Sequence, residues 1–148
     1  MLAFILLIPG LALPVGGGAI AQIANNLLSH DDRAYYRKAY RAAKKKDWPG
    51  AHRLARRAKD PLPAKALRWL NYRESGNRVS FAEISGFLDA NPAWPSRRRL
   101  IQRAEEAMEK SRVSDQTALD WFSLHHPLSG PGQIRLAEAM LANGMQED

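Results

Sequence analysis

Clusters of basic side chains are the feature of this sequence that points most directly to chemistry. Three lysines stand together, three arginines follow at short spacing, and three more arginines are consecutive further along the chain. Lysine and arginine neutralise carboxylates and phosphates, and arginine can do so through two parallel hydrogen bonds. Such a pattern is typical of a solvated basic face, and the functional alternative is contact with an anionic polymer or a membrane surface. The residues are Lys44, Lys45, Lys46, Arg53, Arg56, Arg57, Arg97, Arg98 and Arg99.

The positive charge is concentrated in the N-terminal half of the chain. The 148 residues carry a formal net charge of +7; residues 31–74 contain 14 Lys and Arg against 5 Asp and Glu, whereas residues 75–148 contain 8 against 10. An anionic partner is therefore expected to meet the N-terminal half. Tyr35, Tyr36 and Tyr40 lie near the lysine tract and would suit nucleic acid, but the export expected below argues against that partner.

Residue types suited to metal binding or catalysis do not form a convincing pattern. The chain has no cysteine, and the adjacent His125 and His126 have no further His or carboxylate at i+3 or i+4. Glu74 stands in a Gly- and Asn-containing loop, where we expect it to be solvated, whereas a catalytic acid needs a desolvated pocket. We therefore predict no catalytic, cofactor-binding or metal-binding residue and no cofactor.

Hydrophobic periodicity predicts an all-α chain without strands. Residues 80–108 read as a helix hairpin: Phe81, Ile84 and Leu88 share one stripe, the first helix stops at Asn91 before a proline, and Pro95 opens the second helix. In the third helix Leu62, Ala66 and Leu70 are predicted to share the buried face, with Leu67 beside it. The expected helices are 31–46, 49–59, 62–73, 80–91, 95–111, 114–124 and 131–144, with Ser29 and Ser114 as caps and Gly144 as a terminator.

These seven helices are predicted to form repeats. Hairpins that begin near residues 31, 62 and 96 recur at about 31 to 34 residues, which is the range of helical solenoids such as tetratricopeptide (TPR) arrays. The last helix carries two apolar stripes, one with Ile134, Ala137 and Leu141 and one with Leu136 and Met140. We expect another domain of a longer polypeptide, or a partner protein, to cover residues 131–145.

The first thirty residues read as an export signal. They contain no charged side chain, residues 2–13 are almost wholly apolar, and Ala19-Ile20-Ala21 resembles a cleavage site. We predict a signal peptide at 1–21, a short linker at 22–30 and a periplasmic location. An uncleaved anchor or an incomplete N-terminus that lacks its basic residues is the alternative, and a cytosolic RNA binder would require residues 1–21 to be retained.

An ordered set of short motifs resembles the N-terminal superhelical domain of soluble lytic murein transglycosylases. The resemblance covers about residues 31–145. Its pieces are DW (47–48), DPL (60–62), SFAEI (80–84), FL (87–88), NPAWP (91–95), RAEEA (103–107), WF (121–122), PLSG (127–130) and RLAEA (135–139).

The resemblance implies periplasmic work on peptidoglycan, the cell-wall polymer whose β-1,4 bonds these enzymes cleave to leave 1,6-anhydro ends. The family's Glu-Ser and Gly-Leu-Met-Gln elements lie close together, whereas Glu74-Ser75 and Gly144-Met145-Gln146 are far apart here and the second lacks Leu. No family catalytic residue carries over. We expect residues 31–148 to be a truncated superhelical domain without the lysozyme-like catalytic domain, binding glycan strands as a scaffold, with an exported TPR-like protein-interaction module as the alternative.

Overall fold

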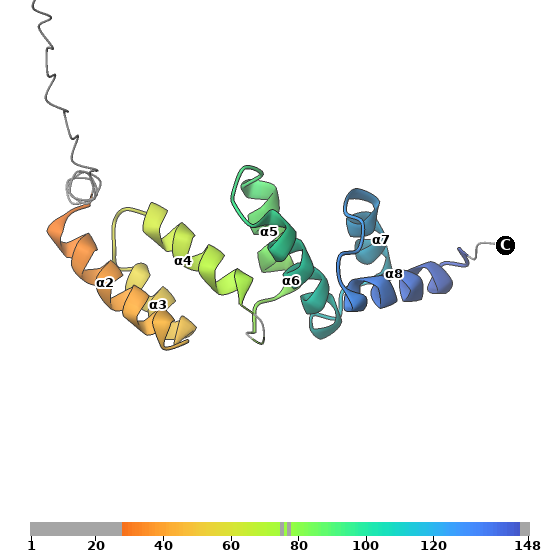
Figure 1. Ribbon diagram of the computed structural model, residues 1–148, viewed down its shortest axis with the longest axis horizontal. Helices are drawn as coiled ribbons and strands as arrows, with labels where there is room; N and C mark the ends of the chain where they lie inside the picture. Colours follow the sequence, from red (N-terminus) through yellow and green to blue (C-terminus); the bar gives the residue numbers. More distant parts are fainter. Residues whose placement is uncertain (1–27, 75, 77, 146–148) are drawn as a thin grey trace, which may run out of the picture.

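The computed structural model describes residues 28–145 apart from 75 and 77, and this part of the chain is entirely helical. Its helices follow one another along one long axis, from α2 at one end to α8 at the other (Figure 1). The predicted signal peptide and most of the predicted linker lie outside the described residues. The seven helices of the described part are α2 (His30–Lys44), α3 (Trp48–Ala55), α4 (Leu62–Arg73), α5 (Phe81–Ala90), α6 (Arg97–Lys110), α7 (Asp115–Leu124) and α8 (Gly130–Ala142).

Serine side chains fix where several of these helices begin. The hydroxyl oxygens of Ser29 and Ser114 accept hydrogen bonds from backbone N–H groups in the first turns of α2 and α7, so both predicted caps are confirmed. At α5 the arrangement is reciprocal: Ser80 accepts from the backbone N–H of Glu83, and the Glu83 carboxylate accepts from the backbone N–H of Ser80. Each cap satisfies an N–H group that the helix itself leaves unpaired.

Three predicted helix boundaries are wrong. Helix α3 ends at Ala55 instead of continuing to 59, and the other two differ because single residues take left-handed backbone conformations. Lys46 has a φ of 61°, so α2 ends at Lys44 instead of continuing to 46. Ser96 has a φ of 62°, so α6 begins at Arg97 and Pro95 stays in the preceding turn. The predicted end of α5 at Asn91 is confirmed, since that residue is its C-cap.

The helices bury two neighbouring clusters of apolar side chains, and α4 contributes to both. Leu67 packs with residues of α2 and α3, while Tyr72 packs with residues of α5 to α8. The predicted buried face of α4 is wrong: Leu62 is 61% exposed and Leu67 is completely buried. The actual face is displaced because α4 must contact helices on two sides and not one.

Packing joins some helices to their neighbours in the chain and others to the next helix but one. Helix α2 packs on α3, α5 on α6 and α7 on α8, while α4 packs on α2, α3 and α6, and α8 packs on α6. The predicted hairpins that begin near residues 62 and 96 would pair α4 with α5 and α6 with α7, and these are not among the close pairs. In α8 this arrangement buries Ala139 and places Leu136 against the core, whereas Ile134 and Leu141 are 63% and 61% exposed. Coverage of that exposed stripe by another domain stays a prediction.

Buried polar side chains tie α2 to the connection between α3 and α4. The carboxylate of Asp32, itself buried, accepts hydrogen bonds from the backbone N–H groups of Lys59 at 2.8 Å and Asp60 at 3.2 Å. The Lys59 contact is the main reason why the pKa of Asp32 lies below its usual value. The hydroxyl of Tyr36 donates to the backbone carbonyl of Asp60 in the same connection, and the hydroxyl of Tyr40 donates to the carbonyl of Pro63 in the first turn of α4, so both rings serve packing.

Candidate functional site

A cleft of about 660 Å³ opens between α3, α4 and the segment that leads into α5. This volume lies in the range of clefts that hold small ligands or short peptides. We call it the basic cleft, because four cationic side chains from different segments line it. They are Lys46 from the turn before α3, Arg56 from the end of α3, Arg68 from α4 and Arg78 from the segment before α5.

The four cations of the basic cleft are exposed, and none of them forms an ion pair with any residue that the structure describes. Two carboxylates also line the cleft, but both are engaged as hydrogen-bond acceptors. Glu74 accepts from the indole N–H of Trp48 at 3.3 Å, and Glu83 belongs to the cap of α5. The cleft is therefore a concave surface with an excess of positive charge and room for an anion.

The wall formed by α3 and α4 carries a half-buried histidine. The Nε2 atom of His52 lies 3.0 Å from the Nδ2 atom of Asn71, a contact in which Nε2 accepts when the ring is neutral and carries its proton on Nδ1. Burial lowers the pKa of His52 below its usual 6.5, and the charges of Arg68 and Arg56 lower it further. His52, Arg56 and Arg68 all line the basic cleft.

The aromatic residues of the cleft are packed and do not form open platforms. Trp48 is 9% exposed and its ring stacks on His52 with centroids 6.2 Å apart. Tyr72 is 7% exposed and meets Phe87 of α5 edge to face at 5.5 Å. Their rings supply rigid walls, since each ring already has a partner in the fold.

A second, smaller cavity of about 530 Å³ shares Trp48 and Glu74 with the basic cleft. It is lined by residues of α2, α4 and α6, among them Lys44, Arg73 and Arg99. The guanidinium of Arg73 lies 4.5 Å from the centre of the Trp69 ring, a cation–π contact. The second cavity extends the positive surface from α3 towards α6.

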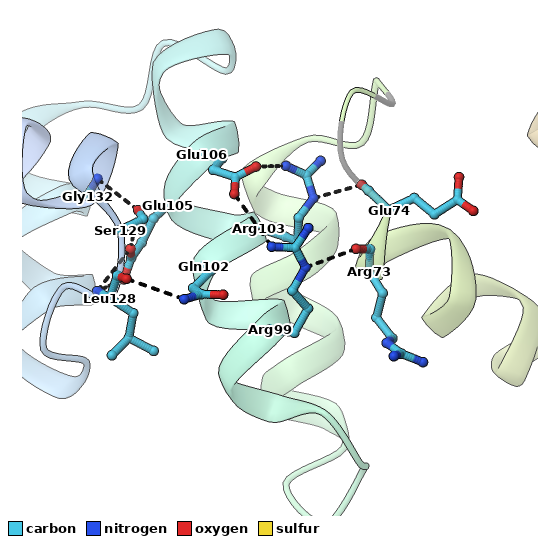
Figure 2. A network of polar contacts seen from close by, with 10 residues as sticks. All are labelled: Arg73, Glu74, Arg99, Gln102, Arg103, Glu105, Glu106, Leu128, Ser129 and Gly132. Atoms are coloured by element: carbon cyan, nitrogen blue, oxygen red, sulfur yellow. Dashed lines mark hydrogen bonds and ion pairs between the residues drawn. The ribbon is translucent and has the colours of Figure 1, made fainter.

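Arginines of α6 hold the end of α4 in place beside these cavities. Figure 2 shows Arg99 and Arg103 reaching the backbone carbonyls of Arg73 and Glu74, at 3.3 Å and 2.8 Å from their Nε atoms, while the Glu74 carboxylate points away from them. Arg103 is 4% exposed and also pairs with Glu106. Cations at the last carbonyls of a helix complement its dipole, so this pair fixes the position of Glu74.

The structure brings only part of the predicted basic set together. Lys46 and Arg56 line the basic cleft, and Lys44 and Arg99 line the second cavity. Arg97 is used inside the fold, because its guanidinium donates to the carbonyl of Leu88 at 3.1 Å. The predicted residues that are exposed and line neither cavity are Lys45, Arg53, Arg57 and Arg98.

The predicted basic set did not include Arg68, Arg73 and Arg78, although they line the two cavities. Each is isolated in the sequence and belongs to no consecutive tract of cations. Arg68 follows Leu67, the completely buried side chain of α4, so a correct buried face for that helix would have placed it on the cleft wall. The expectation for Glu74 is also wrong. It is not a solvated loop residue but the half-buried C-cap of α4, and it lines both cavities.

No group of three or more His, Cys, Asp or Glu side chains placed to hold a metal ion occurs among the described residues. His125 stacks on Trp121 with ring centroids 3.9 Å apart, while His126 is exposed. Within the described part of the chain, every helix is too short or too polar to cross a membrane. Comparison of the chain with protein-family models, curated proteins and solved structures gave no match.

Proposed function

We propose that this chain is a non-catalytic scaffold of the lytic transglycosylase kind, which binds peptidoglycan in the periplasm while cleavage takes place on another domain or protein. The observation that carries the proposal is the basic cleft, in which Lys46, Arg56, Arg68 and Arg78 face a common space without ion-pair partners among the described residues. Peptidoglycan carries carboxylates along its length, and carboxylates form charge-assisted hydrogen bonds with lysine and arginine side chains.

The regular spacing of the helices supports a superhelical scaffold. Helices α3, α5 and α7 begin at residues 48, 81 and 115, which are 33 and 34 residues apart. Each even-numbered helix also packs on the even-numbered helix before it: α4 on α2, α6 on α4 and α8 on α6. Such arrays present extended surfaces to long ligands, which suits a polymer better than a single small molecule.

The carboxyl groups of the basic cleft support a binding role and not a catalytic one. Glu74 accepts a hydrogen bond from Trp48, and Glu83 accepts from the backbone at the start of α5. Both are used to hold the fold. A hydrolytic or lytic acid must instead deliver a proton to a leaving oxygen from a desolvated position.

Sedimentation with purified sacculi tests this proposal. The full chain should pellet with sacculi at low salt and be released as sodium chloride rises, because the contacts are ionic and partly exposed. Chromatography of the supernatant should show no anhydro-muropeptides. Failure to pellet at low salt contradicts the binding role, and release of anhydro-muropeptides by the chain alone contradicts the non-catalytic role.

The second candidate is a TPR-like module that binds a protein. It is favoured by the exposed Ile134 and Leu141 of α8, which form an apolar stripe of the kind that interaction surfaces use. It predicts that one protein dominates a pull-down from periplasmic extract, and that Ile134→Asp abolishes this capture without affecting sacculus binding. Equal capture by the variant excludes the α8 stripe as the site.

A further inference from the structure

The basic cleft is unsuited to stacking sugars. A saccharide platform needs an exposed aromatic face, but Trp48 and Tyr72 are 9% and 7% exposed and each is packed against another ring of the fold. The cleft offers guanidinium and ammonium groups instead. A neutral glycan would gain little from such a surface, whereas a carboxylate could form short, charge-assisted hydrogen bonds with it.

The shape and lining of the cleft further restrict the size and the chemical groups of its ligand. Between the cations lie the small apolar side chains Ala55, Ala64 and Val79, together with Pro49. A ligand that fills this space needs aliphatic groups as well as negative charges. The volume of the cleft, about 660 Å³, suits a few amino-acid residues and is too small for a folded partner.

Three arginines from different segments line the cleft. Arg56 follows the end of α3, Arg68 belongs to α4, and Arg78 lies in the segment before α5. Guanidinium groups bind carboxylates in a bidentate manner, and cations from three directions suit a ligand that carries more than one carboxylate.

We propose that the basic cleft binds a short acidic peptide through its carboxylates, and that the source of this peptide is the peptide stem of peptidoglycan. The inference rests on the proposed function and deepens it, since it assigns recognition to the stems and not to the sugar chain. Each stem presents a glutamate carboxylate, a free terminal carboxylate and aliphatic alanine side chains, which match the cations and the small apolar side chains of the lining.

Isothermal titration calorimetry on the full chain tests the inference. The probes are a synthetic stem tetrapeptide, the same peptide with its carboxylates amidated, peptide-free glycan chains, and an all-L peptide with the same charge. We expect the stem peptide to bind and amidation to weaken binding at least tenfold. Peptide-free glycan should bind more weakly than the stem, because each muramic acid then carries a single carboxylate and no aliphatic side chains. The all-L peptide should also bind more weakly than the stem.

Variants locate the site. Arg68→Ala with Arg78→Ala should weaken stem binding at least tenfold, whereas Arg37→Ala with Lys38→Ala removes the same charge from exposed positions of α2 and should change it less than twofold. If the first pair does not fold, as judged by circular dichroism, Lys46→Gln with Arg56→Gln tests the same cleft from its other side.

The outcomes separate the inference from the proposed function. Binding of sacculi and of peptide-free glycan, with no response to the stem peptide, overturns the inference and leaves the scaffold role standing. Tighter binding of the all-L peptide than of the stem overturns the cell-wall source. Absence of binding to sacculi and to every probe overturns both.

Discussion

At the scale of single residues, the basic side chains divide into those that form hydrogen bonds within the fold and those that line the basic cleft. Arg97, Arg99 and Arg103 donate to backbone carbonyls near the ends of α4 and α5, so their charge is used within the fold. Arg68 and Arg78 make no such contact with a described residue and face the cleft. Replacing Arg68 or Arg78 removes no hydrogen bond or ion pair with a described residue, so the second group is the better target for binding variants.

His52 should make stability depend on pH. Its pKa is lowered in the folded protein, so the unfolded chain binds its proton more readily. Stability is therefore complete above the usual pKa of 6.5 and is lost as the pH falls from there towards the lowered value. The melting temperature of the wild type should drop between about pH 7.5 and 5, and His52→Gln should reduce that drop.

The other histidines are present in both the wild type and His52→Gln, so their contribution to the pH dependence is the same in the two proteins. Equal drops for the wild type and His52→Gln would contradict the assignment of a neutral, half-buried imidazole.

Asp32 should stabilise the fold at neutral pH, because its carboxylate accepts two backbone hydrogen bonds from the connection between α3 and α4. Its pKa is lowered, so this stabilisation is present above the usual value near 3.8 and is lost as the pH falls through the lowered value. Asp32→Asn should unfold at lower urea than the wild type at neutral pH, and the difference should shrink at acid pH.

Asp31→Asn is the matched control for Asp32→Asn, since the neighbouring side chain is 86% exposed. It should leave the urea midpoint nearly unchanged. A similar loss in both variants would point to the helix dipole of α2 and not to the buried contacts.

At the scale of elements, the fold depends on side chains that cap one helix from another. Glu105 of α6 is completely buried, and its carboxylate accepts from the backbone N–H of Leu128 at 2.9 Å and from the hydroxyl of Ser129. Ser129 in turn caps α8 by accepting from the N–H of Gly132 (Figure 2). The start of α8 is thus fixed by a residue of α6.

Gly132→Ala should disturb this joint. A Cβ at this position would lie 2.5 Å from a carboxylate oxygen of Glu105, so the carboxylate must move and its hydrogen bonds must weaken. We expect a loss of about 1–3 kcal/mol in the free energy of unfolding, measured in urea.

Gly86→Ala is the control for Gly132→Ala. Gly86 lies in the middle of α5, and a Cβ added there would meet no neighbouring element within 4 Å. Alanine should therefore stabilise the protein by roughly 0.5–1 kcal/mol through helix propensity. Opposite signs for the two variants support the close contact, and a neutral Gly132→Ala refutes it.

The sequence predicts where most helices lie, but it does not predict which side chains meet in the folded protein. Seven amphipathic or capped segments are visible because period and capping are local properties, and Ser29, Ser114 and Asn91 act as expected. The turns at Lys46 and Ser96 are missed, since nothing local requires a left-handed serine or lysine. Which cations share a cleft depends on how α3 and α4 pack, which no local pattern contains.

At the scale of the whole molecule, the helices form an elongated row with α2 to α4 at one end (Figure 1). Residues 31–74, which cover these helices apart from His30, carry 14 Lys and Arg against 5 Asp and Glu. The basic cleft and the second cavity lie next to each other along α4, and both draw cations from several helices. Adjacent cationic cavities on an elongated molecule are suited to an anionic polymer. The predicted export and family of the chain rest on its sequence patterns and remain proposals, and the proposed partner rests on the basic cleft.

The most direct test of the central claim is sedimentation of variant chains with sacculi at low salt. Arg68→Ala with Arg78→Ala should reduce the pelleted fraction at least fivefold, while Arg37→Ala with Lys38→Ala, which removes the same charge from α2, should pellet nearly as the wild type does. Equal losses in the two double variants, or no loss in the first, would contradict recognition of the cell wall by the basic cleft.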